Sequence, residues 1–363
     1  MRSAICGLSA LSGVMFASAL SAGLVESSAR PIERPAIEGI ELASVSISKN
    51  TRPQGRPLPS DLHAASVRID TPATGFESWV QEFNLRALSQ GIEDQVLRAA
   101  FDGVTYDPNV IKRDRNQSEF SKTIWQYLDS AVSDSRIRNG KAALASHGDI
   151  LDDIEARYGV EKEVVVAIWG LESAYGSYRG SNDVVRSLAT LAYDGRRGAF
   201  FEQQLVAALK ILQSGDTVPR MMTGSWAGAM GHTQFIPTSY LDFAVDFTGD
   251  GRRDIWSDDP TDALASAAAY LKQHGWVTGQ PWGVEVTLPA GFDYRLANRK
   301  ITKSASEWAD IGVLDVNGRA VADRGAASIL LPAGAEGAAF MIFENFGVIE
   351  RYNAADAYVI GVG

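Results

Sequence analysis

The chain of 363 residues is 45% hydrophobic and carries a formal net charge of −10. Its length and apolar content allow a substantial core, divided into about two or three subdomains. Proteins that bind nucleic acid are usually basic, and anionic membranes attract basic surfaces, so the acidity argues against both kinds of partner.

The first residues predict a secretory signal peptide over residues 1–19. Arg2 precedes an apolar stretch over residues 8–16, and Ala17-Ser18-Ala19 offers a cleavage site of small residues. Cys6 is the only cysteine and lies too early for a lipoprotein cysteine, so the mature protein would lack disulfides and a lipid anchor. No other segment is long and apolar enough to cross a bilayer. We expect a soluble exported protein without a membrane anchor.

Residues 20–75 are rich in Ser, Pro and Arg, lack sustained periodicity, and are predicted to form a disordered linker. Helical spacing then dominates, and the clearest helices are predicted over residues 189–212 and 261–274, with a glycine-rich loop over 224–240 between them. Strands are predicted over residues 284–288, 327–331 and 338–343, and a last helical segment over 353–360.

These elements predict a mainly α fold with a small β insertion, an α+β arrangement. The predicted parts are an N-terminal helical subdomain over residues 76–155, a central helical core over 156–282, the β-containing insertion over 283–343 and a return to the core over 344–363.

An apolar helix that begins near Val164 ends in a carboxylate at Glu172. Val164, Ile168 and Glu172 recur every four residues on the face expected to look into the core. Burial raises the pKa of a carboxyl because the charged form loses its water, and a helix that stops near Gly176 adds the negative end of its dipole. Both effects favour a protonated carboxyl, which a general acid requires. The alternatives are an ion pair with an arginine such as Arg179, or a side chain that points outward.

Two further patches supply the groups expected in a cleft for an uncharged polar polymer. The loop over residues 224–240 contains glycines, which let a backbone approach a ligand closely, and neutral hydrogen-bonding groups at Ser225 and Gln234. The C-terminal part contains Arg351-Tyr352-Asn353 and Tyr358, whose aromatic rings offer stacking surfaces.

With these patches in order, residues 76–363 resemble the lytic murein transglycosylases of the membrane-bound B type, including their soluble periplasmic forms. The resemblance rests on residues 168–172, 224–240, 246–256 and 351–353. It implies a lysozyme-like core, a periplasmic location and peptidoglycan glycan strands as the partner. It also implies non-hydrolytic cleavage of the MurNAc–GlcNAc β-1,4 bond, which gives 1,6-anhydro-muramyl ends.

In this resemblance Glu172 is the single catalytic residue and needs no cofactor. It would protonate the bridging oxygen and then accept a proton from the muramyl 6-hydroxyl, whereas ordinary glycosidases use two carboxyls. The other acids near these patches, Asp183, Asp194 and Glu202, lie on polar stretches. The positions that match substrate-contacting residues of the family are Tyr127, Ser225, Gln234, Tyr270, Tyr352, Asn353 and Tyr358.

Ordinary packing, with the hydroxyl at the surface, is the alternative for each of these tyrosines. For the whole chain, the alternatives to the transglycosylase are a hydrolytic muramidase of lysozyme type that uses water, and a non-catalytic glycan-binding protein. We expect a monomer.

A segment that begins at Asp246 is similar to the first half of an EF-hand calcium loop. Ser257 stands where the closing Glu would be, and the family resemblance suggests a longer loop that Asp262 closes. A structural Ca²⁺ and a purely structural turn rich in Asx residues are both open alternatives, and an ion would stiffen the loop rather than take part in chemistry. The other candidate ligands are Asp246, Thr248, Asp250 and the carbonyl of Arg252.

Overall fold

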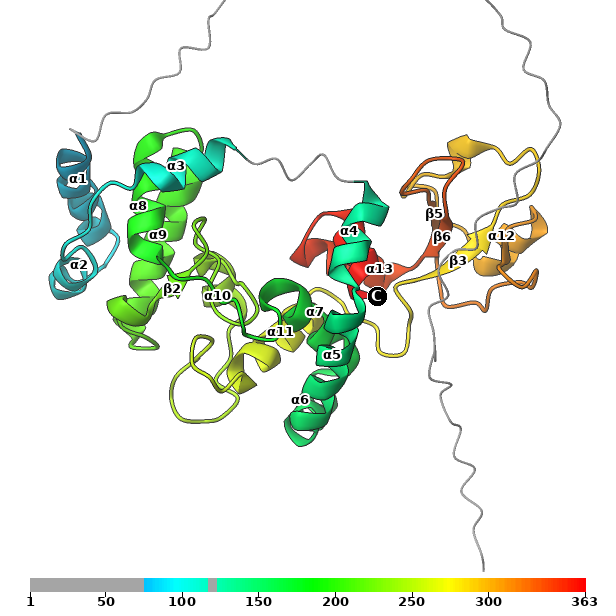
Figure 1. Cartoon of the computed structure of the whole chain (residues 1–363), viewed down its shortest axis with the longest axis horizontal. Coiled ribbons are helices and arrows are strands. Elements are labelled where there is room, and N and C mark those ends of the chain that lie inside the picture. Colours follow the sequence, from blue (N-terminus) through cyan, green and yellow to red (C-terminus); the bar gives the residue numbers. More distant parts are fainter. Residues whose placement is uncertain (1–74, 117–122) are drawn as a thin grey trace, which may run out of the picture. The chain divides into compact units, whose positions relative to one another are not determined.

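The structure of the protein, a computed structural model, describes residues 75–116 and 123–363. The signal peptide expected over residues 1–19 and the linker expected after it, apart from Gly75, lie outside the described residues. The described part is mainly helical, with two small sheets (Figure 1). The predicted fold class, mainly α with a small β part, is therefore confirmed.

Three N-terminal helices pack against a later helical pair. The first begins at Phe76, where the sequence predicts the start of the folded part, and buries Phe76 and Phe83. The Asp107 side chain caps the third by accepting a hydrogen bond from the backbone N–H of Asn109. These helices are α1 (Phe76–Ser89), α2 (Asp94–Ala100) and α3 (Pro108–Arg115), and they contact α8 (Val184–Asp194) and α9 (Gly198–Ser214).

The prediction of one helix over residues 189–212 is wrong, because α8 and α9 divide this stretch. Gly195 adopts a left-handed conformation with φ of 81° and ends α8, and α9 starts three residues later. Glycine tolerates this conformation because it has no Cβ. The two helices have apolar residues at similar spacing, which hides the break in the sequence. They pack side by side (Figure 1).

The helix that carries Glu172 lies among four others. This helix, α7 (Lys162–Ser173), buries Val165, Ile168 and Trp169. Because these residues recur at helical spacing, the core fixes the rotation of α7 about its axis. The helices that contact it are α5 (Asp134–Ser146), α6 (Gly148–Tyr158), α11 (Thr261–Gln273) and α14 (Asp356–Val362), and α4 (Ile124–Ala131) packs on α14.

A glycine-rich loop separates α9 from α11, as predicted. It follows the short helix η3 (Pro219–Met221) and begins in β2 (Thr223–Gly224), which pairs antiparallel with β1 (Asn182–Asp183). The predicted loop over 224–240 is too long by four residues, because Pro237 begins α10 (Pro237–Phe243). Proline suits the first helical position, where no intrahelical N–H bond is lost. The helix predicted over 261–274 is confirmed as α11.

The β-containing part forms a four-stranded antiparallel sheet in the order β4-β3-β6-β5. It has its own core, which includes Trp308 and Met341. The three predicted strands are present, and three short elements, η4, α12 and β4, were not predicted. The elements are β3 (Gly283–Thr287), η4 (Tyr294–Leu296), α12 (Ala305–Asp310), β4 (Leu314–Asp315), β5 (Ser328–Leu330) and β6 (Ala339–Ile342).

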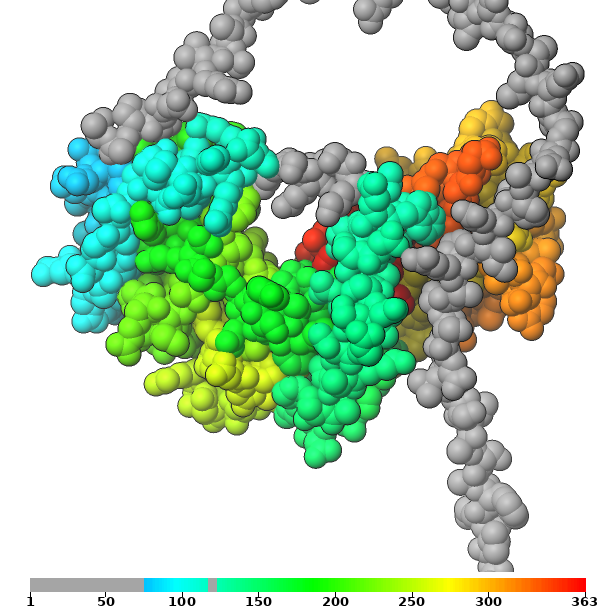
Figure 2. Space-filling model, viewed as in Figure 1, coloured from blue at the N-terminus to red at the C-terminus, as the bar shows by residue number. Residues whose placement is uncertain are grey.

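After the sheet, α13 (Glu344–Tyr352) and α14 return to the helical core. The buried apolar residues of this core form a single cluster that includes Phe76 and Val362. In Figure 2 the red C-terminal segment lies beside the teal α4, in agreement with the contacts between α14 and α4. None of the helices described here combines the length and apolar character needed to cross a membrane.

Candidate active site

Glu172 is partly buried in the last turn of α7. Burial raises the pKa of its carboxyl to about 7, although the hydrogen bond from Tyr358 works in the opposite direction. The Tyr358 hydroxyl donates that bond to Oε1 over 2.7 Å. A carboxyl with this pKa is half protonated near neutral pH and can both donate and accept a proton.

The chain leaves α7 through three consecutive residues with positive φ. Ala174, Tyr175 and Gly176 have φ values of 49°, 58° and 80°, and the first two are strained because they carry a Cβ. The helix therefore ends at Ser173, three residues before the expected end at Gly176. The Tyr175 hydroxyl donates to the Arg136 carbonyl over 2.8 Å and so holds the turn. Strain of this kind next to a functional group indicates a turn that the surrounding structure fixes in place.

The ion pair between Glu172 and Arg179, one of the two alternatives from the sequence, is wrong. The Arg179 guanidinium instead pairs with Asp258, with Nη2 2.8 Å from Oδ1, and donates to the Trp256 carbonyl over 3.0 Å. Glu172 has no ion pair with any residue of the described segments. An unpaired, partly buried carboxyl is consistent with its raised pKa.

Three of the predicted tyrosines lie near Glu172. Tyr358 binds it directly, and the negative charge of Glu172 contributes to the raised pKa values of Tyr127 and Tyr352, for which burial is the larger cause. The Tyr352 hydroxyl donates to the Thr233 carbonyl over 2.6 Å, which ties α13 to the glycine-rich loop. The hydroxyl of Tyr358 is therefore buried against a partner, and not at the surface as the packing alternative would require.

Tyr270 and Asn353 bind the backbone of the segment that carries Tyr352 and Tyr358. The Tyr270 ring is 8% exposed, its hydroxyl donates to the Arg351 carbonyl over 2.6 Å, and its ring contacts that of Tyr352 edge-on at 4.9 Å. The Asn353 side chain accepts a hydrogen bond from the Ala355 backbone N–H over 3.1 Å, in the turn between α13 and α14. Both residues therefore fix the segment that carries Tyr352 and Tyr358, and their described hydrogen bonds go to this segment rather than to Glu172.

Ser225 and Gln234 hold the glycine-rich loop in shape. The Ser225 hydroxyl oxygen accepts hydrogen bonds from the backbone N–H groups of Ala227 and Ala229, which leaves its proton available to donate. The Gln234 amide nitrogen donates to the carbonyls of Arg179 and Gly231 over 3.1 and 2.8 Å, which leaves its oxygen available to accept. Their described hydrogen bonds go to backbone groups of the loop and of Arg179 rather than to Glu172.

One residue that the sequence analysis did not single out also contacts the end of α7. His232 is 3% exposed, and the indole N–H of Trp169 donates to its Nδ1 over 3.1 Å. The available signal was a single histidine among small and apolar residues of the loop, one of only 4 histidines in the sequence. That signal alone does not distinguish a functional residue from ordinary packing.

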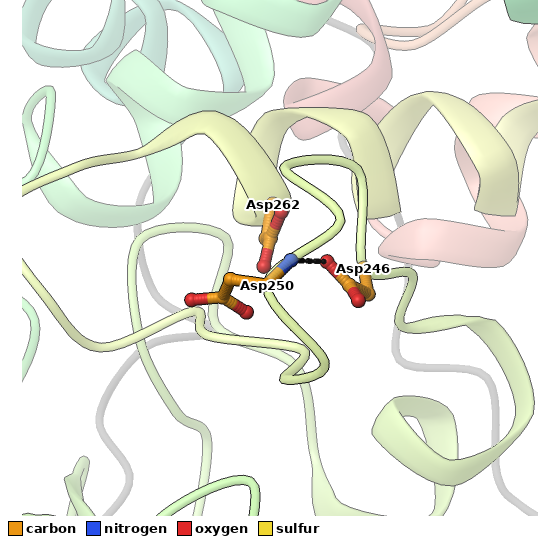
Figure 3. A group of neighbouring side chains, drawn as sticks. All are labelled: Asp246, Asp250 and Asp262. Carbon is orange, nitrogen blue, oxygen red and sulfur yellow. Dashed lines mark hydrogen bonds between the residues drawn. The ribbon is translucent and has the colours of Figure 1, made fainter.

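The carboxylates of the EF-hand-like segment converge. One oxygen from each of Asp246, Asp250 and Asp262 lies within 4.8 Å of the others (Figure 3). Asp262 is buried, and burial raises its pKa although the backbone N–H groups of Thr248, Phe247 and Asp254 donate to it. The Thr248 hydroxyl donates to Asp246 over 3.3 Å, and the Arg252 backbone N–H donates to Asp250.

Such a group of oxygens fits a hard divalent cation. The buried Asp262 has no arginine or lysine partner within the part of the chain that the structure describes. The three carboxylates that converge are therefore the ones expected as calcium ligands from the sequence. The same segment also has the hydrogen bonds of an Asx-rich turn.

The family model described as "Transglycosylase SLT domain" matches residues 75–363. The chain is 33% identical over 244 residues to the membrane-bound lytic murein transglycosylase B of Escherichia coli (strain K12), which covers 65% of this chain and 64% of that protein. The chain thus spans just under two thirds of the length of that relative.

Two solved structures extend the comparison. SltB3 from Pseudomonas aeruginosa, in complex with NAG-NAM-pentapeptide, is 54% identical with a TM-score of 0.77, covering 79% of this chain and 78% of that one. The Escherichia coli lytic transglycosylase SLT35, in complex with calcium, is 30% identical with a TM-score of 0.67, covering 78% and 89%. The matched range of residues 75–363 is most of the sequence, and the chain belongs to the transglycosylase SLT domain family.

Proposed function

We propose that the protein is a lytic transglycosylase that cleaves the MurNAc–GlcNAc β-1,4 bond of peptidoglycan without water and leaves 1,6-anhydro-muramyl ends. The observation that carries the proposal is the Glu172 carboxyl, whose pKa of about 7 comes from burial without a cationic partner. Membership of the family and the similarity to SltB3, solved with NAG-NAM-pentapeptide, support the same substrate class.

In the first step, protonated Glu172 donates its proton to the glycosidic oxygen while the bond from that oxygen to muramyl C1 breaks. Positive charge then develops at C1, and the new carboxylate beside it is favourable. General acid catalysis of this kind contributes about 10² to 10⁴ in rate.

In the second step, the Glu172 carboxylate accepts the proton of the muramyl 6-hydroxyl, and the oxygen of that hydroxyl bonds to C1 and closes the anhydro ring. The Tyr358 hydroxyl stabilises the carboxylate between the two steps, because it donates to Oε1 over 2.7 Å. Glu172 ends protonated, ready for another cycle.

One carboxyl is enough for this sequence of steps, because the substrate supplies its own nucleophile. The other acids considered from the sequence are engaged elsewhere: Asp183 caps α8, Asp194 pairs with Arg115, and Glu202 pairs with Arg86. Glycosidases that use water or a covalent intermediate need a second carboxyl within about 5 to 10 Å of the first. This favours the transglycosylase over the hydrolytic muramidase.

Four of the remaining predicted site residues are proposed to bind the sugar chain, and two to position their neighbours. Ser225 has a hydroxyl proton and Gln234 an amide oxygen that their loop contacts leave available. Tyr127 and Tyr352 offer ring faces near Glu172, while Tyr270 and Asn353 position the segment that carries Tyr352 and Tyr358.

The proposed setting is the periplasm, reached through the signal peptide expected over residues 1–19, with peptidoglycan glycan strands as the partner. We propose a monomer.

We also propose that Asp246, Asp250 and Asp262 hold a structural Ca²⁺, with Thr248 and the Arg252 carbonyl completing the ligands. The convergence of the three carboxylates and the similarity to SLT35, solved with calcium, support this. The ion would stiffen the loop that leads into α11 and would take no part in the proton transfers.

Analysis of the products released from purified sacculi by mass spectrometry tests the proposed function. The wild-type protein is expected to release anhydro-muropeptides, which are lighter by one water than hydrolytic products. Hydrolytic products alone would support the muramidase, and binding to sacculi without any product would support the non-catalytic glycan-binding protein. Either result would overturn the proposal.

A further inference from the structure

The shorter contacts of the His232 ring favour one proton arrangement. An indole N–H can only donate, so the Trp169 contact at 3.1 Å requires a lone pair on Nδ1. A carbonyl can only accept, so the Ser257 oxygen, 2.7 Å from Nε2, requires a proton there. Arg179 Nη1 also lies 3.2 Å from Nε2, but it donates to the carbonyls of Trp256 and Ser257. The ring is thus neutral, with its proton on Nε2, and burial lowers its pKa, in keeping with this form.

The backbone of His232 also connects the glycine-rich loop to its neighbours. Its N–H donates to the Ile255 carbonyl over 3.0 Å, and its carbonyl accepts a hydrogen bond of 2.6 Å from the Ser173 hydroxyl. Ser173 directly follows Glu172, and Trp169 precedes it by about one helical turn. The His232 ring therefore binds a residue about one helical turn before Glu172 in α7, and the His232 backbone binds the residue directly after it.

The ring also presses against the strained turn after α7. A Cβ added at Gly176, whose φ is 80°, would lie 2.5 Å from the His232 Cε1 atom. The side chains of His232, Trp169 and Arg179 line a cavity of about 230 Å³. Loss of the ring would let the turn relax and give water from this cavity access to the end of α7.

We propose that His232 is a positioning residue for Glu172, which fixes the last turn of α7 and the following left-handed turn against the segment around Ser257. The inference rests on the proposed function of Glu172. His232 touches no reacting atom and acts through Trp169 and the backbone that flanks Glu172.

The pH dependence of kcat/KM is set by the charged and titratable groups around Glu172 and His232. Tyr127, Tyr352 and Tyr358 face Glu172. The groups around the His232 ring are Arg179, whose Nη1 is 3.2 Å from Nε2, and Asp254, Asp258, Asp259 and His147.

The first test compares His232→Phe, which keeps a ring but removes both ring hydrogen bonds, with the wild-type protein. The expected result is a fall in kcat of about 10-fold to 100-fold, as for a small misplacement of a catalytic group, with KM nearly unchanged. The basic limb of the kcat/KM profile should move to lower pH, because Glu172 gains water and its pKa falls. An unchanged kcat and an unmoved limb would overturn the proposal.

Trp169→Phe supplies a second variant in case His232→Phe does not fold. It removes the donor to Nδ1 and should shift the pH limb in the same direction, and the double variant should lose less than the sum of the two effects. If the effects of the two substitutions were fully additive, Trp169 and His232 would not act on Glu172 through the same contact. Asp114→Asn, which lies on α3, controls for a general loss of stability and should leave the limb in place.

NMR readouts separate this inference from the proposed function. The ¹⁵N shifts of the His232 ring are expected to show an unprotonated Nδ1 and a protonated Nε2. The ¹³C titration of Glu172, measured without substrate, should give a lower pKa in His232→Phe than in the wild type. If the sacculi yield no anhydro products, the proposed function fails while this titration still tests the positioning. An equal Glu172 pKa in both proteins would refute it.

Discussion

Two helices of this protein place a carboxyl one residue before their end, and the two carboxyls behave in opposite ways. Asp114 in α3 is 2% exposed and accepts hydrogen bonds of 2.7 Å from Arg196 Nε and from Arg197 Nη2. Burial alone would raise its pKa, but the two arginines together lower it. Glu172 in α7 has only the neutral Tyr358 hydroxyl, and burial raises its pKa to about 7.

The difference lies in the partner rather than in the helix. The negative end of each helix dipole disfavours both anions, and both side chains lose water. Two guanidinium groups make Asp114 a permanent anion that joins α3 to the turn between α8 and α9. Without a cation, Glu172 keeps a proton that it can transfer. A buried acid is therefore a candidate catalyst only when the surrounding residues leave it unpaired.

The sharpest test of this comparison is the activity of Glu172→Gln. Gln keeps the size of the side chain but cannot transfer a proton, so the rate of anhydro product release should fall by at least about 10³-fold while binding to sacculi persists. Glu163→Gln, on the exposed face of the same helix, is the matched control and should retain full activity. Residual activity within tenfold of the wild type would remove Glu172 from its role.

The same substitution should stabilise the protein at alkaline pH. The pKa of Glu172 is about 7 in the folded state and near its ordinary value of 4.5 in the unfolded state, so folding becomes less favourable as the pH rises between these values. Above this range the penalty reaches up to about 3 kcal/mol, and Gln removes it. Urea unfolding on both sides of the range measures the difference, which should vanish at acid pH. A variant less stable than the wild type at alkaline pH would contradict the unpaired state of Glu172.

Asp114→Asn should give the opposite result. The pKa of Asp114 is lowered on folding, so its contribution is complete above the unfolded value of 3.8 and is lost as the pH falls through the folded value. At neutral pH the variant should be less stable by about 2 kcal/mol, less than for a fully buried pair because both arginines are nearly half exposed.

The control for Asp114→Asn is Asp94→Asn, which breaks an ion pair with Arg98 whose two side chains are 57% and 80% exposed. This change should leave the unfolding free energy nearly unchanged, because water and salt screen an exposed ion pair. If both substitutions cost the same, burial of Asp114 does not explain its behaviour.

The two carboxyls also differ in what the sequence could predict. The apolar run before Glu172 is local, so its raised pKa could be expected from a few neighbouring residues. Its partner Tyr358 lies 186 residues away, and the arginines that bind Asp114 lie 82 and 83 residues away, so neither contact has a local pattern. The helix break at Gly195 was missed for a related reason: apolar spacing continues on both sides, and the turn that places Arg196 and Arg197 is fixed by packing.

A further test removes the hydrogen bond that Tyr358 donates to Glu172. Tyr358→Phe takes away a donor that stabilises the charged carboxylate, so the pKa of Glu172 should rise further. The basic limb of the kcat/KM profile should then move to higher pH by about one unit, the value of one such hydrogen bond. Tyr294→Phe, which removes a hydroxyl from a half-exposed ring, should leave the limb in place. A limb that moves to lower pH would mean that Tyr358 acts mainly by excluding water.

Asp262 is a third buried acid, and it lies between the two cases. Burial raises its pKa, it has backbone donors instead of an arginine, and the carboxylates of Asp246 and Asp250 lie beside it (Figure 3). If Ca²⁺ pairs with the Asp262 carboxylate as the arginines pair with that of Asp114, calcium at about ten times its Kd should stabilise the wild-type protein by about 1.4 kcal/mol. Asp250→Ala should abolish this gain, measured as the difference in Tm between calcium and chelator, whereas Asp242→Ala, an exposed acid on α10, should retain it. Equal shifts of Tm for Asp250→Ala in calcium and in chelator would mean that the loop is an Asx-rich turn held by its own backbone, and that a buried carboxyl can be kept in place without any cation.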